Sequence, residues 1–523
     1  MLLFKAKSKS RVKVSVIDLG FNSIKLVNYD VKKNGTFKAY QQEGIKVKLG
    51  EGLDHRTGYL SGMPVQRTIS ALKMFRDIID FDSIEQVLPI ATSVVREAGN
   101  KDDFLKQIYN HTGFQFKVLS GQEEGLYSYV GALRATCMPT TLFFDLGGGS
   151  LELVYTENYN IKKIKSYPLG ALRMSNMFGE KNGTFSKRNY NKMQQYILDV
   201  LPDKKEFDMS WDTTLIGVGG TLRAMARYDQ ELNKYGLDKI HQYEMDYLSV
   251  SSIAKNIYKM DADRLAENKA IGADRAGTIT AGAAIINLLM EKLGFKEVVV
   301  SAQGLREGVL YVFIRDPATY YNKKLRNGKV KGFVTFACKP ETLPRYTLTL
   351  IKPLVIAGIM REKEKMILAQ AIKEVADLPL ITNLHNLFHI MIDEDNAFLS
   401  HREQIILALS IIHARKEKTA DWLFSRYKSI LESQNKESIE KISACLELSS
   451  ILERAKIEVK LSIRGRKKAD INIKPSAKQF VPSTLLAEAL KKFERAFGIS
   501  VSCYIVSEKN AAPKESIIVI ERK

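Results

Sequence analysis

The chain carries one short segment twice. Residues 16–27 read VIDLGFNSIKLV, and residues 143–154 read FFDLGGGSLELV. In both copies an apolar run ends in an aspartate, a turn rich in glycine, asparagine or serine follows, and a second apolar run leaves the turn. Each copy therefore predicts a β-hairpin with a tight turn. This repeat constrains the fold more than any other feature, because two equivalent hairpins indicate two related halves.

The turn residues suit a phosphate ligand. Glycine lets the backbone approach a ligand closely, and consecutive N–H groups in a tight turn form an anion-binding concavity. An aspartate at the end of a strand can hold a metal ion or a metal-bound water. One Asp-Leu-Gly sequence is an ordinary hairpin turn, but two copies predict half-sites that face each other across a cleft. The predicted phosphate-binding residues are Asp18, Gly20, Asn22 and Ser23 in the first turn and Gly147, Gly148 and Ser150 in the second.

The second copy differs from the first in ways that bear on chemistry. Gly149 makes its turn a run of three glycines, and Glu152 replaces Lys25 of the first copy. Glu152 stands between two leucines in an apolar strand, where an unpaired carboxylate is costly to bury. We therefore expect Asp145 and Glu152 to be metal ligands. An edge strand that exposes Glu152 to solvent is the alternative.

Strand and helix patterns alternate between the two copies. Apolar residues at helical spacing predict a helix over 64–81, EQVLPIATS predicts a buried strand, and 94–110 predicts a second helix. Arg96 then lies near a strand-to-helix junction, where α/β proteins place ligands. QFKVLS predicts a short strand, and GQEEGLYSYVGALRA predicts the next helix.

Two glutamates begin that helix. Ser120 and Glu123 have the Ser-x-x-Glu spacing of a capping box, which gives Glu123 a structural role. Glu124 has no such role, so it is the candidate for a general base that acts on a water molecule. The alternative is a first-turn glutamate that only interacts favourably with the helix dipole.

The pattern continues after the second copy. Residues 213–228 predict a strand, a Gly-Gly turn and a helix, so Gly219, Gly220 and Thr221 lie at a helix N-terminus that favours phosphate. Residues 272–294 predict a closely packed helix of small residues, and KEVVVS predicts a strand. SAQGLREGVLY then places Arg306 near a turn. The alternation over residues 14–315 predicts α/β layers in two lobes.

Charge and composition narrow the class of partner. The formal net charge of +20 at pH 7 favours a polyanion such as nucleic acid, polyphosphate or an anionic membrane, with a solvated lysine-rich surface as the alternative. No apolar run is long enough to span a bilayer, and the N-terminus lacks a secretory-signal pattern. We therefore expect a cytoplasmic protein without a membrane partner. The four cysteines form no CxxC pair, so neither a zinc site nor a disulfide framework is predicted.

Seven motifs occur in a fixed order over residues 14–315: VIDLGFNS, ATSVVREA, LSGQEEG, FFDLGGGSLELV, YPLGALR, GVGGT and SAQGLREG. This series resembles the exopolyphosphatase/guanosine pentaphosphate phosphohydrolase (Ppx/GppA) family. The resemblance implies two ribonuclease-H-like lobes of the actin, sugar-kinase and heat-shock ATPase superfamily, with the active site between them. It also implies a requirement for Mg²⁺ or Mn²⁺ and a homodimer.

The resemblance assigns roles to residues that the patterns had already singled out. Glu124 corresponds to the catalytic base of the family, Asp145 and Glu152 to its metal-associated carboxylates, and Arg96 to an arginine that holds the phosphate chain. The two turns correspond to the two phosphate loops. The chain departs from the family at Phe21, where serine is common, so a hydroxyl contact in the first loop is lost while backbone donors remain.

The last 200 residues or so follow a different pattern. Residues from about 344 to 455 predict amphipathic helices, which resemble the degenerate HD-type domain of long family members. Lys373 stands where a metal-binding histidine would be needed, so we expect no metal there. His385, His389 and His413 are expected to be structural or surface residues.

Strand and helix patterns over residues 457–523 predict a small α/β domain. A basic patch in this segment predicts either a solvated hairpin or a track that guides a long polyanion. The patch consists of Lys460, Arg464, Arg466, Lys467 and Lys468. Four domains are thus predicted: a ribonuclease-H-like lobe (1–135), a second such lobe (136–320), a helical HD-like domain (321–456) and the small α/β domain (457–523).

The leading functional prediction is an exopolyphosphatase that releases terminal orthophosphate from inorganic polyphosphate by metal-assisted attack of water. A guanosine pentaphosphate (pppGpp) 5′-phosphohydrolase and a non-catalytic sensor of phosphate chains or nucleotides are the alternatives. The grouped carboxylates argue against a sensor, because a pure anion site would not place acidic groups beside bound phosphate. A sugar or acetate-type kinase would share the loops, but LSGQEEG resembles the phosphatases. Nucleic-acid binding by the basic tail is a further alternative, although interleaved aromatic residues for base stacking are sparse there.

Overall fold

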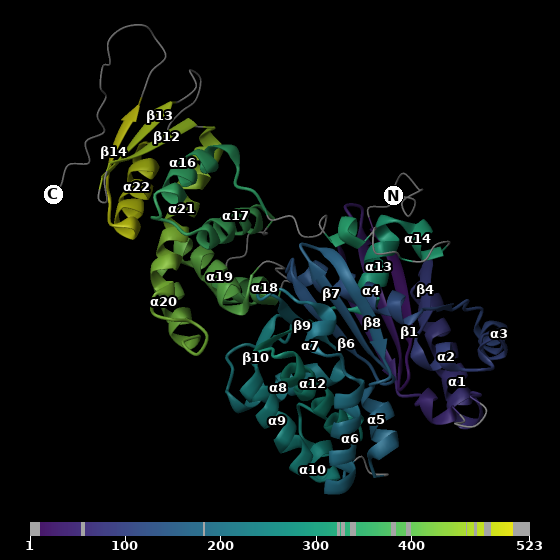
Figure 1. The fold of residues 1–523 in the computed structure, drawn as a ribbon. Helices are drawn as coiled ribbons and strands as arrows, with labels where there is room; N and C mark the ends of the chain where they lie inside the picture. The colour runs from purple at the N-terminus through teal and green to yellow at the C-terminus, as the bar shows by residue number, and fades with distance from the viewer. Residues whose placement is uncertain are drawn as a thin grey trace. The chain divides into compact units, whose positions relative to one another are not determined.

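A computed structural model provides the fold (Figure 1). It describes residues 11–53, 58–180, 184–321, 325, 330–334, 341–377, 383–393, 399–456, 458–464, 468–474 and 483–505. The chain divides into two compact units, of which the first comprises residues 1–234 and 239–338, and the second residues 235–238 and 339–523. Within these described ranges, no helix combines the length and the apolar character needed to cross a membrane.

The first sheet of unit 1 has five strands in the order β3-β2-β1-β4-β5. β1, β2 and β3 are antiparallel neighbours, whereas β4 runs parallel to β1 and β5 parallel to β4. Apolar side chains of β1 and β2 pack with those of α1 and α3 in one core. The elements of this half are β1 (Arg11–Leu19), β2 (Ile24–Lys32), β3 (Phe37–Ile45), the 3-10 turn η2 (Leu49–Gly52), α1 (Gly62–Phe81), β4 (Gln86–Ala91), α2 (Ser93–Glu97), α3 (Lys101–Thr112) and β5 (Lys117–Val118).

The second sheet repeats this topology. Its order is β10-β11-β9-β6-β7-β8, with β6, β7 and β8 antiparallel and with β9 parallel to β6. The sequence repeat therefore extends to the order of five strands in each sheet, which confirms two ribonuclease-H-like lobes, and β10 is an additional antiparallel edge strand of the second. The strands are β6 (Thr141–Leu146), β7 (Leu151–Glu157), β8 (Asn160–Tyr167), β9 (Thr214–Val218), β10 (Tyr243–Asp246) and β11 (Glu297–Val300).

Among the remaining helices of unit 1, α8 packs directly on this sheet. α8 contacts β6, β9 and β11, and α9 and α12 pack against α8 (Figure 1). The helices are α5 (Ala171–Phe178), α6 (Lys187–Val200), α7 (Lys204–Phe207), α8 (Gly220–Leu232), α9 (Tyr247–Lys259), α10 (Ala262–Glu267), α11 (Ala273–Ala276), α12 (Ile279–Leu293), α13 (Leu305–Arg315) and α14 (Pro317–Tyr321).

Two helices connect the lobes by packing closely on each other. α4 (Gly121–Thr136) packs on β6, β7 and β8 of the second sheet, whereas α13 packs on α4 and on β1 of the first. Two glycines make the close approach possible. A Cβ atom on Gly131 would lie 2.0 Å from the carbonyl oxygen of Gly304, and one on Gly308 would lie 1.8 Å from that of Tyr127. The crossing therefore holds the first turn of α4 beside the second sheet.

Two predicted helices are each broken in the structure. The helix predicted over 94–110 consists of α2 and α3, because Ala98 is extended and the N–H of Gly99 bonds to the carbonyl of Gly58, a tertiary partner. The helix predicted over 272–294 consists of α11 and α12, separated at Gly277 and Thr278. The predictions for 64–81, for the strand at Gln86–Ala91 and for the helix after Ser120 are confirmed.

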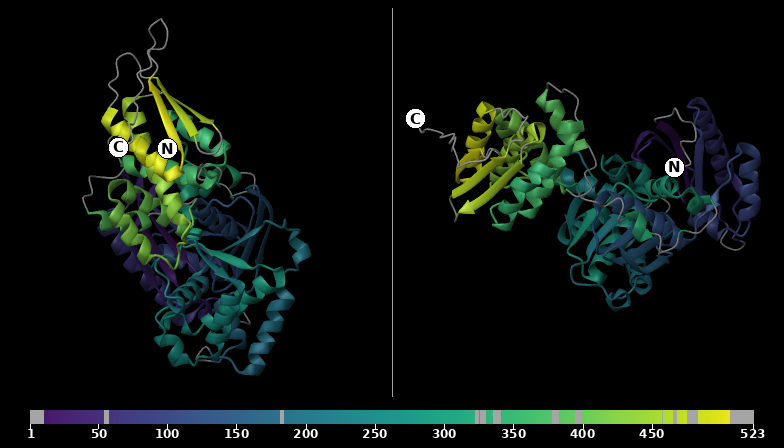
Figure 2. Two further views of the ribbon diagram at one scale, coloured as in Figure 1. Left: turned by 90° about the vertical axis from the view of Figure 1, so that its left-hand side faces the viewer. Right: turned by 90° about the horizontal axis from the view of Figure 1, so that it is seen from above.

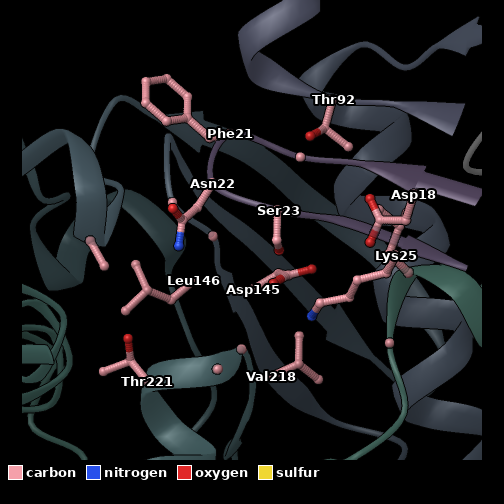
Figure 3. A pocket seen from close by; sticks show the side chains of 18 of the residues that line it. Asp18, Phe21, Asn22, Ser23, Lys25, Thr92, Asp145, Leu146, Val218 and Thr221 are labelled. Carbon is pink, nitrogen blue, oxygen red and sulfur yellow. The ribbon is translucent and has the colours of Figure 1, made fainter. Parts of the chain in front are cut away.

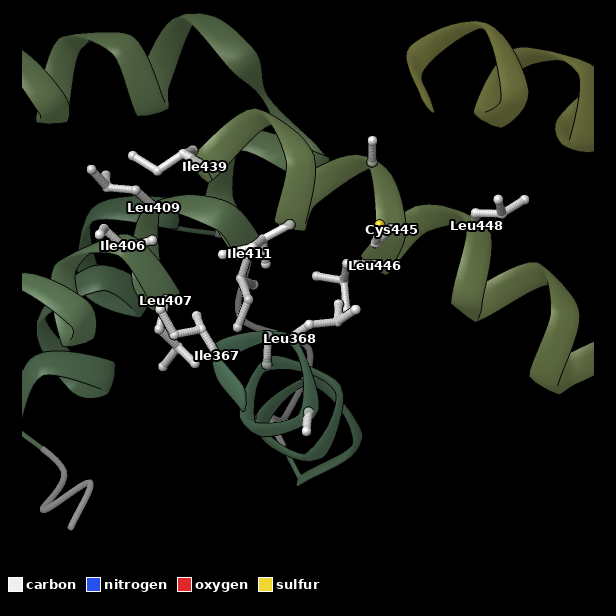
Figure 4. Packing of buried hydrophobic residues seen from close by; sticks show 14 of the residues in the cluster. Ile367, Leu368, Ile406, Leu407, Leu409, Ile411, Ile439, Cys445, Leu446 and Leu448 are labelled. Carbon is white, nitrogen blue, oxygen red and sulfur yellow. The ribbon is translucent and has the colours of Figure 1, made fainter. Parts of the chain in front are cut away.

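Unit 2 has a helical part with a single apolar core (Figure 4). Leucine and isoleucine side chains of α17, α19 and α21 interlock there around Cys445, which is buried and free. The predicted run of amphipathic helices is confirmed, while its relation to HD domains stays a prediction. The helices are α16 (Arg345–Ile356), α17 (Glu362–Asp377), α18 (Leu384–Asp393), α19 (His401–Arg415), α20 (Glu417–Arg426) and α21 (Asn435–Ala455).

The end of unit 2 is a three-stranded sheet with one helix beside it (Figure 2). β13 pairs antiparallel with β12 and parallel with β14. Lys460 and Lys468 of the predicted basic patch are exposed, whereas Arg466, Lys467 and the side chain of Arg464 lie outside the described residues. The elements are β12 (Glu458–Arg464), β13 (Lys468–Lys474), α22 (Ser483–Phe497) and β14 (Ser500–Ile505).

Cys137 and Lys373, which bear on the predictions for the cysteines and for the HD-like domain, both have bonding partners. Cys137 is disulfide-bonded, which the spacing of the cysteines did not predict. Lys373 forms an ion pair with Glu341 at 2.6 Å.

Candidate active site

The two repeated turns have the same backbone geometry. The N–H of Gly20 donates to the carbonyl of Ser23 at 3.1 Å, and the N–H of Gly147 donates to that of Ser150 at 3.0 Å. Each bond closes the turn between two antiparallel strands, as the sequence predicts. The same backbone hydrogen bond thus closes the turn in both lobes.

Both turns line one cleft of about 490 Å³ in unit 1 (Figure 3). The N-terminus of α8 and the start of α13 complete its walls. All predicted site residues except Arg96 and Glu152 line this cleft. They are Asp18, Gly20, Asn22, Ser23, Glu124, Asp145, Gly147, Gly148, Ser150, Gly219, Gly220 and Thr221.

Glu124 is buried in the first turn of α4 and is held by Arg96. The Nη1 atom of Arg96 donates to Oε2 of Glu124 and to the carbonyl of Leu119, both at 2.8 Å. Burial raises the pKa of Glu124 to about 7, against the opposing charge of Arg96. The predicted capping box is present, with reciprocal bonds between Ser120 and Glu123. Glu123 therefore caps the helix, and Glu124 is free to accept a proton near neutral pH.

Asp145 and Glu152 are direct cross-strand partners in β6 and β7. Ser128, one turn after Glu124 on α4, donates to Oδ2 of Asp145 at 2.5 Å. Oε1 of Glu152 accepts from Ser166 at 2.8 Å, whereas its Oε2 is buried and has no hydrogen-bond partner among the described residues. β7 lies between β6 and β8, so the alternative of a solvent-facing edge strand is excluded.

These two carboxylates lie where negative charge is unfavourable. Burial is the main reason that the pKa values of Asp145 and Glu152 are both raised. The negative charges of Glu124 and Asp145 raise the pKa of Glu152 further. Oε2 of Glu152 is buried without a partner among the described residues, and the carboxylates of Glu152 and Asp145 repel each other. A bound cation would satisfy this oxygen and remove the repulsion. No group of three or more His, Cys, Asp or Glu in the described ranges could hold a metal ion. A cation held by this pair would therefore take its other ligands from water and phosphate, as Mg²⁺ commonly does.

Several positively charged side chains of the cleft were not predicted as site residues from the sequence. Lys25, Arg223, Arg275 and Arg306 come from β2, α8, α11 and α13 and line the cleft. Lys25, Arg223 and Arg275 make no ion pair or side-chain hydrogen bond with any described residue. Burial lowers the pKa of Lys25 to about 8, with further lowering by Arg306 and Arg223. One signal was available, because Lys25 occupies in the first copy the position of Glu152 in the second.

Phe21 has a packing role. Its ring is 7% exposed and points away from Ser23 and Asp145 (Figure 3). A Cβ atom on Gly50 would lie 1.8 Å from this ring, and one on Gly149 would lie 2.7 Å from it. The ring therefore fills the space between the first turn, Gly50 and the second turn. It also explains why a glycine is needed at position 149.

The second turn has another support from α5. Nε of Arg173 donates to the carbonyl of Gly149 at 2.7 Å, and its Nη2 donates to both carboxylate oxygens of Glu97 at 2.9 and 2.7 Å. Glu97 ends α2 in the first lobe. The two lobes are thus connected beside the turns by an ion pair as well as by the ring of Phe21.

The Ppx/GppA phosphatase family matches residues 29–315, which are more than half of the chain. A bifunctional 3-dehydroquinate synthase/phosphatase of Fusobacterium nucleatum is 28% identical over 310 residues, which cover 56% of this chain and 46% of that protein. A guanosine-5′-triphosphate,3′-diphosphate pyrophosphatase of Pseudoalteromonas translucida is 27% identical over 328 residues, which cover 61% of this chain and 62% of that one. The chain thus spans less than two thirds of either relative.

A solved structure shows the same fold. The crystal structure of an exopolyphosphatase from Cytophaga hutchinsonii is 23% identical in sequence and has a TM-score of 0.53. The similarity covers 58% of this chain and 98% of that one.

Proposed function

Because the chain belongs to the Ppx/GppA phosphatase family, we propose that it is an exopolyphosphatase, which releases terminal orthophosphate from inorganic polyphosphate. The proposal rests on one observation. A buried carboxylate with a pKa of about 7, Glu124, lies in the same cleft as two phosphate-compatible turns. A general base is most effective when its pKa lies near the working pH.

In the proposed reaction the two turns hold the end of the phosphate chain through their backbone N–H groups. Glu124 accepts a proton from the attacking water, and Arg96 orients the Glu124 carboxylate through the bond at 2.8 Å. Lys25 and Arg306 neutralise charge on the phosphoryl oxygens, which is the main requirement for phosphoryl transfer. Arg96 is thereby a positioning residue; it does not line the cleft, so its contact with the phosphate chain stays a prediction.

Asp145 and Glu152 are the residues that would hold Mg²⁺ or Mn²⁺ in this proposal. The ion would supply further neutralisation of phosphoryl oxygens. Ser128 and Ser166 fix one oxygen of each carboxylate. The second oxygen of each carboxylate makes no hydrogen bond to Ser128 or Ser166, so these two hydroxyl groups do not compete with the ion for it.

Hydrolysis of pppGpp is the second candidate function. The relative from Pseudoalteromonas translucida is named a guanosine-5′-triphosphate,3′-diphosphate pyrophosphatase, and the same groups would serve that reaction. The unpaired cations of the cleft and the net charge of +20 favour the longer polyanion.

Phosphate release by the full chain tests the proposal. Long-chain polyphosphate is the substrate, with and without Mg²⁺, and pppGpp and ATP are the controls. Glu124→Gln is expected to lower kcat by about 10²–10⁴-fold while polyphosphate still binds. Glu231→Gln is the matched control, because Glu231 is an exposed residue of α8 that does not line the cleft.

Each outcome has a definite meaning. Near-normal turnover by Glu124→Gln would remove Glu124 from its role. Turnover of pppGpp without turnover of polyphosphate would replace the proposed exopolyphosphatase function by pppGpp hydrolysis. Binding of polyphosphate without release of phosphate from any of the three substrates would mean that the protein is a non-catalytic sensor.

A further inference from the structure

Two arginines of α8 and one of α11 lie along the N-terminal half of α8. Arg223 and Arg227 are one helical turn apart, so they lie on the same side of α8. Arg275 belongs to the short helix α11, and a Cβ atom on Gly220 would lie 3.1 Å from its Nε. Arg275 therefore lies against the first residue of α8. We refer to Arg223, Arg227 and Arg275 as the α8 arginine cluster.

The cluster concentrates positive charge that the chain does not neutralise. None of its members makes an ion pair or a side-chain hydrogen bond within the part of the chain that the structure describes. The pKa of Arg275 is lowered by burial and then by Arg227, and the pKa of Arg223 is lowered by burial, Arg306 and Arg275. The positive end of the α8 dipole adds to this charge.

Nearby carboxylates offset the cluster only in part: Glu307 raises the pKa of Arg223 and Asp274 that of Arg275, but burial and the neighbouring arginines outweigh them. Asp274 precedes Arg275, but it is directed to the first lobe: Nζ of Lys46 lies 3.1 Å from its carbonyl oxygen and 3.9 Å from its carboxylate. Asp229, on the next turn of α8, is buried and accepts hydrogen bonds from Tyr243 and Asn233. An anion from outside the chain is the remaining means of neutralising the three arginines.

The cluster extends from the cleft to the surface. Arg223 and Arg275 line the cleft and are half-buried. Arg227 is exposed and is not one of the cleft residues. An elongated anion that leaves the cleft along α8 would contact all three arginines.

We propose that the α8 arginine cluster binds the phosphates that follow the reacting end of the chain, and that Arg227 selects linear polyphosphates long enough to leave the cleft. This inference rests on the proposed function and adds the chain-length preference. Every unit of a linear polyphosphate carries negative charge, so a long chain offers a phosphate to Arg227. In pppGpp a ribose interrupts the run of phosphates after the 5′-triphosphate, and tripolyphosphate has only two phosphates after the reacting one.

The test compares Arg227→Ala with Arg188→Ala in the full chain. Arg188 is the matched control, because it is an exposed arginine of α6 without an ion pair among the described residues. For each protein, kcat and KM are measured with long-chain polyphosphate, tripolyphosphate and pppGpp at several salt concentrations. Circular dichroism checks that both variants fold.

Arg227→Ala is expected to raise KM for long-chain polyphosphate about tenfold, the usual effect of losing one charge-assisted contact. KM for tripolyphosphate and pppGpp should stay within about twofold, kcat should not change, and Arg188→Ala should resemble the wild type. The slope of log KM against log salt for the long chain should become less steep by about 0.7, because one phosphate contact is lost.

Two results would overturn the inference: an unchanged KM for the long chain, or an equal rise for all three substrates. Failure of the proposed function is distinguishable, because the wild type would then release no phosphate from polyphosphate. Calorimetric binding of long-chain polyphosphate to the wild type and to Arg227→Ala would still decide the matter. An affinity about tenfold lower in the variant would support the subsite, and equal affinities would exclude it.

Discussion

Replacing Phe21 by serine tests whether the ring holds the two phosphate turns together. The ring is 7% exposed and lies in contact distance of Gly50 and Gly149, so it joins the first turn to the second. Serine is common at this position in the family that the chain resembles. The substitution therefore asks what the phenylalanine contributes in this chain.

The expected loss of stability follows from the burial of the ring. Exchange of a buried phenylalanine for a small residue costs about 3–5 kcal/mol, from lost transfer free energy and from the cavity left behind. The hydroxyl group introduced by the exchange recovers at most one hydrogen bond, about 1 kcal/mol. We expect the free energy of unfolding to fall by about 3 kcal/mol.

Activity should fall for a separate reason. Without the ring, the first turn and Gly149 lose a direct apolar contact, while the ion pair of Arg173 with Glu97 remains beside them. Small displacements of groups that position a substrate cost one to two orders of magnitude in rate. We expect kcat/KM for polyphosphate to fall by about ten- to a hundredfold.

Urea unfolding followed by circular dichroism measures the first effect, and phosphate release measures the second. Phe81→Ser is the matched control, because Phe81 is 90% exposed at the end of α1. Its effect on stability should stay within about 0.5 kcal/mol. Equal unfolding midpoints and equal turnover for Phe21→Ser and Phe81→Ser would refute the packing role of Phe21.

Two further predictions concern the cleft. Since burial lowers the pKa of Lys25 to about 8, Lys25 loses its proton in the free protein as pH rises through 8, whereas bound phosphate favours the charged form. KM for polyphosphate should therefore rise above pH 8 in the wild type, and Lys25→Arg should remove this rise. The same rise in the wild type and in Lys25→Arg would exclude Lys25 as the titrating group. Ser128→Ala removes the donor to Asp145 at 2.5 Å and should raise the Mg²⁺ concentration for half-maximal activity about tenfold, with recovery in Ser128→Thr. An unchanged Mg²⁺ dependence would mean that Asp145 keeps its position without this hydroxyl.

Much of the fold follows from local patterns in the sequence. The twin turns are predictable because a hairpin turn is set by a few consecutive residues, and both close with the same backbone bond. The capping box at Ser120 is equally local, and it separates the structural Glu123 from Glu124. The apolar periods predict the main strands and helices of both lobes.

The breaks in two helices were not predictable, because their causes lie elsewhere in the chain. The N–H of Gly99 bonds to the carbonyl of Gly58, and no periodicity over residues 94–110 signals that bond. The disulfide at Cys137 is a similar case, since cysteine spacing alone does not indicate a pair.

The sequence by itself determined which residue types stand at the ends of the strands, and therefore the chemistry available to the site. Only the tertiary structure decided which of them meet. It brings Arg96 to Glu124, Ser128 to Asp145, and Lys25, Arg223 and Arg275 to one cleft. The physical reason is that patterns of a few residues specify the local backbone and the buried face, whereas contacts between distant elements depend on how whole sheets and helices pack.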